Sequence, residues 1–227
     1  MEHPNKRLQL LPKIFLIFHL LLWCIIFQAQ ALTPSKPIKT SKNKNSATSA
    51  SAIFVFGDST SDPGNNNYVE TIFKGNFLPY GRDFANRIPT GRFSNGRLSS
   101  DFIASYLGLK EYVPPYLDPT LTTKELMTGV SFASAGTGYD PLTSQLSNVI
   151  PVLKQLEYFK EYKKRIELEI GKQQTEDHIK KAIFLISAGT NDFVVNYFTL
   201  PMRRKIFTVP SYEQFVIQHL KHFLQVR

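Results

Sequence analysis

Short apolar runs alternate along the chain with longer segments whose apolar residues recur every three or four positions. Residues 52–56 (AIFVF), 130–134 (VSFAS) and 182–187 (AIFLIS) are short and largely apolar, which is typical of strands buried on both faces of a parallel sheet. Helical spacing of apolar residues is found at 99–107, 151–170 and 211–226. Strands that alternate with helices predict an α/β fold with a doubly wound parallel sheet.

Local signals indicate how these helices begin and which side they bury. In the first helix, Ser99 or Ser100 can cap the first turn, and Gly108 lies near the end. Pro151 suits the first turn of the second helix. The residues expected to face inward are Phe102, Ile103, Tyr106 and Leu107 in the first helix, and Phe215, Leu220 and Phe223 in the third.

The first 51 residues differ from the rest of the chain. An apolar run at 14–27 follows Lys6, Arg7 and Lys13, and Ala29 and Ala31 form a small-residue cleavage pattern after it. About fourteen apolar residues are too few for a usual membrane span, so we predict a signal peptide at 1–31, with an uncleaved anchor as the alternative. Residues 32–51 are polar and lysine-rich and predict a flexible linker. Residues 52–227 then form the folded domain.

Charge and cysteine content exclude several classes of protein. The net charge is +9, but residues 1–51 carry six of these charges, so the predicted domain is only mildly basic. Nucleic acid is therefore a poor candidate partner. The only cysteine, Cys24, lies in the predicted leader, which excludes a disulfide scaffold for the mature chain.

A polar turn follows each predicted strand, and in parallel sheets ligands bind at this carboxyl edge. Ser59 follows the first strand and could be a nucleophile, or a turn or cap residue. Gly136 could offer a backbone N–H to a developing oxyanion, or simply allow a turn. Asn191 could offer a side-chain N–H, or form an Asx turn. Taken one at a time, these residues favour the structural alternatives.

Four motifs in order resemble the GDSL family of the SGNH hydrolase superfamily, particularly its plant branch. They are residues 56–67 (FGDSTSDPGNNN), 91–97 (GRFSNGR), 132–138 (FASAGTG) and 189–192 (GTND). The resemblance implies a three-layer, flavodoxin-like fold, with Ser59 as nucleophile and with Gly136 and Asn191 in the oxyanion hole. Gly136 is preferred to Gly138 for that role. The implied reaction is hydrolysis of a carboxylic ester, in a lipid or an acetylated cell-wall polysaccharide, without a cofactor or metal.

One part of the family pattern is missing. The family has an Asp-x-x-His motif near its C-terminus, and no aspartate here has a histidine three positions later. His178, His219 and His222 are the remaining candidates for a base, and all fit poorly. The sequence therefore predicts the N-terminal portion of the fold, with three of the five strands that the resemblance implies and an open sheet edge. A secreted, extracellular ester hydrolase is the main interpretation, and a catalytically impaired or purely binding protein is the alternative.

Overall fold

The computed structural model describes residues 50–225. The predicted signal peptide at 1–31, nearly all of the predicted linker at 32–51 and the final two residues lie outside this range. The elements are β1 (Ile53–Gly57), a 3-10 turn η1 (Asn65–Tyr68), α2 (Ser99–Tyr106), α3 (Thr123–Leu126), α4 (Pro141–Ser147), α5 (Val152–Ile170), α6 (Lys172–Lys180), β2 (Ile183–Ser187), a π-helix η2 (Asp192–Thr199), α7 (Pro201–Arg204) and α8 (Val209–Gln225).

The sheet is parallel, as predicted. β1 pairs with β2 from Ile53↔Ile183 to Gly57↔Ser187. On the other side of β1, segment 128–134 forms a parallel bridge at Ser131 with Val55, and Ser131 also bridges to Pro115. The order across the sheet is therefore the segment at 115, the segment at 131, β1 and β2.

The predicted strand at 130–134 is shorter than expected. The Gly57 N–H, for example, donates to Gln155 Oε1 at 2.9 Å instead of to a carbonyl of this segment, although the Gly57 carbonyl still accepts the N–H of Ser134. Asn65 Nδ2 likewise donates to the carbonyls of Ser131 and Ala133, both at 2.8 Å. Side-chain bonds thus replace part of the strand pairing.

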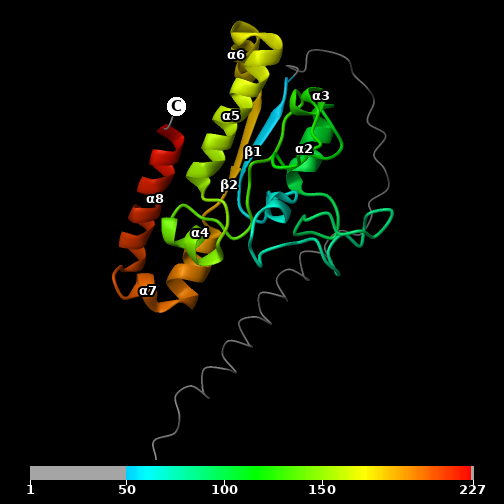
Figure 1. The fold of residues 1–227 in the computed structure, drawn as a ribbon. Helices are drawn as coiled ribbons and strands as arrows, with labels where there is room; N and C mark the ends of the chain where they lie inside the picture. Colours follow the sequence, from blue (N-terminus) through cyan, green and yellow to red (C-terminus); the bar gives the residue numbers. More distant parts are fainter. Residues whose placement is uncertain (1–49, 226–227) are drawn as a thin grey trace, which may run out of the picture. The chain divides into compact units, whose positions relative to one another are not determined.

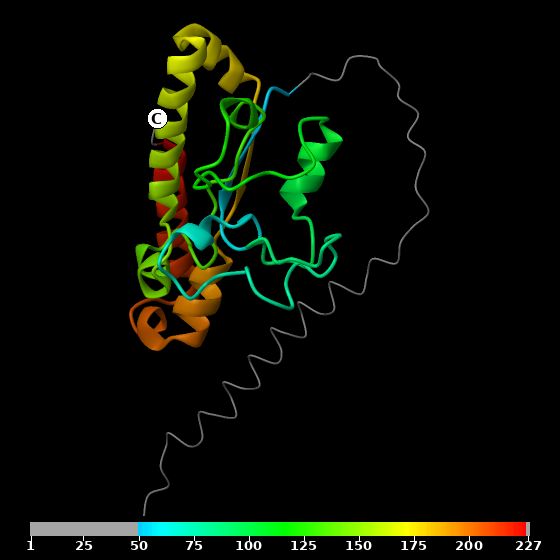
Figure 2. The ribbon, with the colours of Figure 1, turned by 45° about the vertical axis from the view of Figure 1, so that its right-hand side comes forward.

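Helices cover both faces of the sheet, which confirms a three-layer α/β arrangement (Figure 1 and Figure 2). On one face, Phe54 and Phe56 pack with Phe159 of α5 and Phe223 of α8. On the opposite face, Ile53 and Val55 pack with Ala104 of α2 and with Val113. The alternation of side chains along β1 thus supplies both halves of the core.

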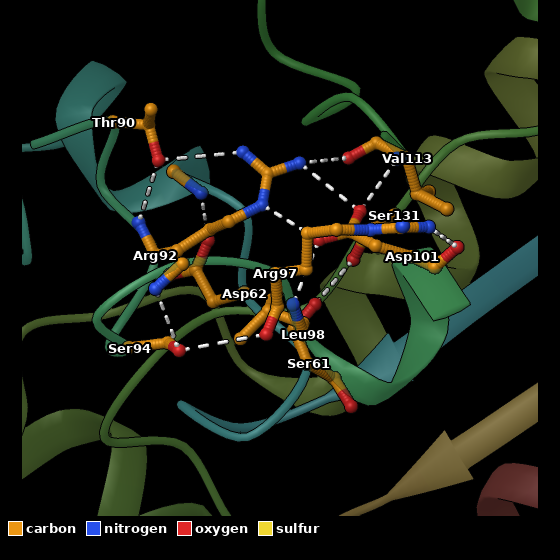
Figure 3. Close-up of polar contacts among 12 residues, drawn as sticks. Ser61, Asp62, Thr90, Arg92, Ser94, Arg97, Leu98, Asp101, Val113 and Ser131 are labelled. Atoms are coloured by element: carbon orange, nitrogen blue, oxygen red, sulfur yellow. Dashed lines mark hydrogen bonds and ion pairs between the residues drawn. The ribbon is translucent and has the colours of Figure 1, made fainter. Parts of the chain in front are cut away.

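Helix α2 forms as predicted, and Ile103 packs against the core, but the rest of its inward face differs from the one predicted. Phe102 and Tyr106 are 57% and 91% exposed, whereas Ser100, Asp101 and Ala104 are buried. The cause is polar, because the Asp101 carboxylate accepts hydrogen bonds from Arg92 and from the N–H of Leu98 at the helix start. Asp101, rather than Ser99 or Ser100, therefore caps this helix (Figure 3).

The other two helix predictions are largely confirmed. Pro151 directly precedes α5, with an extended backbone, and Tyr162 and Ile166 in that helix are fully buried. In α8, Phe223 is buried, and Phe215 and Leu220 pack partly against the same core.

β2 carries the open edge of the sheet that the sequence predicts. No strand pairs with its outer side among residues 50–225. Ile183, Phe184 and Ile186 consequently remain 37%, 44% and 38% exposed, although apolar strand residues are usually buried. Within the same residues, no helix combines the length and apolar character needed to cross a membrane.

Candidate active site

Ser59 lies in a tight turn directly after β1. The turn is fixed by Asp58, whose N–H donates to the Ser187 carbonyl at 3.0 Å and whose carboxylate accepts the N–H and hydroxyl of Thr60. Burial raises the pKa of Asp58 against the opposing effect of these donors. Ser59 itself is half-buried, and its hydroxyl has no hydrogen-bond partner among residues 50–225. A serine held at a strand end with a free hydroxyl is open to a ligand.

The loop after Ser59 is fastened to the segment that contains Gly136. The carboxylate of Asp62 accepts the N–H groups of Gly64 and Asn65 at 2.8 and 2.7 Å, and that of Ala135 at 2.9 Å. Burial raises the pKa of Asp62 to about 6, although these donors act in the opposite direction. Asn66 adds a second connection, because its Nδ2 donates to the Ala135 carbonyl at 3.0 Å. The main role of Asp62 and Asn66 is therefore structural: their hydrogen bonds hold the loop after Ser59 against the segment that contains Gly136.

Gly136 and Gly138 are glycines for different physical reasons. Gly136 has φ +87° and is half-buried, so its backbone is both in the left-handed region and accessible. A Cβ on buried Gly138 would stand 2.0 Å from Asp192 Oδ1, which shows that this position admits no side chain. No atom of residues 50–225 accepts a hydrogen bond from the N–H of Gly136 or of Ser59. These two donors are therefore available.

Asn191 is held against the same turn by its side chain and by its neighbour. Its Nδ2 donates to the Thr137 carbonyl at 2.9 Å, which uses one of the two amide N–H groups. The adjacent Asp192 accepts the N–H groups of Tyr139 and Asp140 at 2.8 and 3.1 Å. Burial raises the pKa of Asp192 to about 6, while its hydrogen bonds lower it in part.

The three predicted site residues thus lie at the carboxyl ends of neighbouring strands of the sheet. Ser134, two residues before Gly136, donates its N–H to the Gly57 carbonyl at 2.9 Å. Ser187, four residues before Asn191, pairs with Gly57 from the other side. The strand ends that carry Ser59, Gly136 and Asn191 are therefore immediate neighbours.

Sequence reasoning missed the buried polar residues that support this edge. Asp62, Asn66 and Asp192 have exposed fractions of 0%, 1% and 0%. The motifs do contain these short polar side chains, but hydrophobic periodicity assigns polar, glycine-containing stretches to surface loops, so their burial was not predicted. The second motif, at 91–97, is also structural, because the Arg92 guanidinium bonds to both oxygens of Asp101 and to the Val113 carbonyl (Figure 3).

No histidine in the described part of the chain serves Ser59. His178 lies at the opposite end of β1, because its carbonyl accepts the hydroxyl of Ser51 at 2.5 Å, and burial lowers its pKa. His219 Nδ1 is 2.9 Å from the Phe215 carbonyl of its own helix, and His222 is exposed and has no hydrogen-bond partner among residues 50–225. Within residues 50–225, no cluster of potential ligands suitable for a metal ion occurs either.

The sequence of the whole folded region matches a known family. Residues 53–224 match the family model described as GDSL-like lipase/acylhydrolase. The chain belongs to this family. A curated relative, GDSL esterase/lipase At5g45960 of Arabidopsis thaliana, is 66% identical over 177 residues, covering 78% of this chain and 47% of the relative. GDSL esterase/lipase At1g06990 of the same plant is 40% identical over 210 residues, covering 92% and 58%.

The match to the family is partial in length. GDSL esterase/lipase APG of Arabidopsis thaliana is 47% identical over 174 residues, which cover 77% of this chain and 49% of that protein. The chain spans about half the length of the curated relatives it matches. No solved structure matches it.

Proposed function

We propose that this protein is a serine hydrolase of carboxylic esters, with Ser59 as the nucleophile. The observation that carries the proposal is the free hydroxyl of Ser59 at the carboxyl end of β1. The N–H groups of Ser59 and Gly136 there also have no acceptor among residues 50–225. The Ser59 oxygen attacks the ester carbonyl, and the N–H groups of Ser59, Gly136 and Asn191 stabilise the oxyanion. The alcohol leaves with a proton, and water then releases the acid from the acyl-serine.

A base that accepts the proton of Ser59 is needed for rapid turnover, because a serine hydroxyl alone is a weak nucleophile. Since no histidine of residues 50–225 contacts Ser59, we propose efficient catalysis for a form that also carries an Asp-x-x-His motif. For residues 50–225 alone, the same observation favours the second candidate, a catalytically impaired protein that binds esters beside Ser59.

Fluorophosphonate labelling and hydrolysis of p-nitrophenyl acetate test both candidates on the purified protein. The enzyme proposal predicts labelling and turnover that disappear in Ser59→Ala, while Ser61→Ala serves as a control from the same loop. Rapid turnover that survives Ser59→Ala would refute the nucleophile. Labelling with little turnover would favour the impaired form.

The substrate and the location are proposed from the sequence alone. We propose secretion into the extracellular space, including the cell wall, after cleavage behind Ala31, with no stable membrane insertion of the mature chain. Mass spectrometry of the N-terminus tests this, because an intact Met1 on the cellular product would contradict cleavage. The substrate is proposed as a small or polymeric ester, with lipid acyl esters and acetylated polysaccharides as the two classes.

A further inference from the structure

A cavity of about 800 Å³ runs along the edge of the sheet that is formed by the segment at 115. Its lining extends from Pro63, in the loop after Ser59, to Thr128, which pairs with the start of β1. None of the three predicted catalytic residues lines it. The cavity is therefore separate from the candidate active site, although both are reached by the same loop.

Two tyrosines make this cavity suited to a ligand with flat, partly apolar faces. Tyr68 and Tyr112 line it and are 46% and 41% exposed. A tyrosine offers a rigid aromatic face together with a polar edge, and large exposed rings commonly mark binding surfaces. The C–H face of a sugar ring packs on such a surface, and its hydroxyls remain free for hydrogen bonds.

Asp118 supplies a hydrogen-bond acceptor beside one of these rings. Its Oδ1 accepts the N–H and hydroxyl of Thr120 at 2.9 and 2.7 Å, while its Oδ2 has no donor among residues 50–225. Burial and then the charge of Asp118 raise the pKa of Tyr68, which reflects how near the two groups are. An aromatic face next to a free carboxylate oxygen can hold a ring and a hydroxyl together.

The cavity lining carries three cations, Arg92, Lys110 and Lys124, and two carboxylates, Asp118 and Glu125, so its charges nearly balance and favour a neutral ligand. Arg92 is neutralised by Asp101, with which it forms a buried pair at 2.9 Å. Lys110 donates to the carbonyls of Glu125 and Gly129 at 2.8 and 2.6 Å, so its head is already engaged. The aliphatic lining is limited to Leu109 and three prolines, which offers little to a long acyl chain.

We infer that this cavity binds a neutral carbohydrate chain, with Tyr68 as the platform for a sugar ring and Asp118 as an acceptor for its hydroxyls. The inference goes beyond ester hydrolysis and does not require that Ser59 be catalytic. If both hold, the cavity keeps a polysaccharide on the protein while an ester on it reaches Ser59, so the acetylated polysaccharide becomes the favoured substrate class.

Calorimetric titration of the purified protein with β-1,4-linked xylohexaose and with cellohexaose tests the inference. We expect saturable binding of at least one, weakened about fivefold or more by Tyr68→Ala, as for loss of an aromatic contact. Tyr106→Ala is the matched control, because Tyr106 is 91% exposed on α2 and lies outside the cavity. Asp118→Ala provides a second variant if Tyr68→Ala lowers the melting temperature.

Several outcomes would overturn the inference. Absence of saturable binding to both sugars, or equal binding by Tyr68→Ala, Asp118→Ala and the parent, excludes a carbohydrate site here. Competition by lysophosphatidylcholine micelles would instead assign the cavity to lipid. Failure of the catalytic proposal is distinguishable, because Ser59→Ala should abolish hydrolysis and leave sugar binding unchanged.

Discussion

Replacing Arg92 by alanine should destabilise the protein by about 3 kcal/mol, because it leaves a buried carboxylate without its counter-ion. The Arg92 and Asp101 side chains are 7% and 0% exposed. Arg92 donates to the two oxygens of Asp101 at 2.9 and 3.1 Å and to the Val113 carbonyl at 3.0 Å. All three bonds disappear together in Arg92→Ala.

The magnitude follows from what remains around Asp101. Breaking a buried ion pair on one side typically costs about 3–5 kcal/mol. Asp101 would keep the N–H groups of Leu98 and Val113 at 2.8 and 2.7 Å, so we expect the lower end of this range. Arg92→Lys should cost about half as much, since lysine keeps the charge and loses the planar fork.

Urea unfolding provides the measurement, and the chain contains a matched control. Arg82 and Asp83 form an ion pair at 3.9 Å whose side chains are 59% and 67% exposed. Exposed pairs contribute about 0–1 kcal/mol, so Arg82→Ala should change the unfolding free energy little. If Arg92→Ala and Arg82→Ala differed by less than about 1 kcal/mol, the structural role of the 91–97 motif would be wrong.

Three further predictions concern the site, the pH dependence and the open edge. In a form with turnover, Asn191→Ala should lower kcat by about a hundredfold or more, and steady-state kinetics that showed only a few-fold loss would exclude an oxyanion role. Burial raises the pKa values of Asp62 and Asp192 to about 6 in the folded protein, above about 3.9 in the unfolded chain. The folded state therefore holds these protons more tightly, so their contribution to the free energy of unfolding is complete below pH 4 and is lost as the pH rises through 6. Urea titrations from pH 4 to 7 should therefore show a flatter pH dependence in Asp192→Asn, and an unchanged slope would contradict the assignment. Ile186→Lys on the open edge should reduce self-association in analytical ultracentrifugation, whereas Leu168→Lys, at an 88% exposed helix position, should not; equal effects would refute edge pairing.

The sequence predicted the apolar framework well because that framework depends on periodicity. Residues 53–57 and 183–187 are strands, and α8 packs Phe215, Leu220 and Phe223 against the core as predicted. Helix α2 forms where predicted and packs Ile103 against the core, but its inward face was partly mispredicted, because tertiary bonds to Asp101 outweigh the attraction of Phe102 and Tyr106 to the core. A local apolar stripe cannot reveal a partner such as Arg92, nine residues earlier in a loop.

The strand at 130–134 shows a second limit of sequence reasoning. Its composition fits a strand, but Asn65 and Gln155 take backbone partners that a neighbouring strand would otherwise use. Asn65 lies 68 residues before Ala133, and Gln155 lies 98 residues after Gly57. Their role depends on the folded topology, which a single sequence does not encode in local patterns.

The buried carboxylates of the motifs explain why the candidate site can form without a base at Ser59. Asp62 joins the Ser59 loop to Ala135, next to Gly136, and Asp192 joins the Asn191 segment to Tyr139 and Asp140. Each carboxylate is surrounded by backbone N–H donors, so the proposed oxyanion donors are placed by bonds that do not involve a histidine. Positioning of the donors and activation of the nucleophile are thus separate tasks in this fold. Loss of Asp62 or Asp192 should therefore disturb the placement of N–H groups, whereas addition of a base should change the reactivity of Ser59 alone.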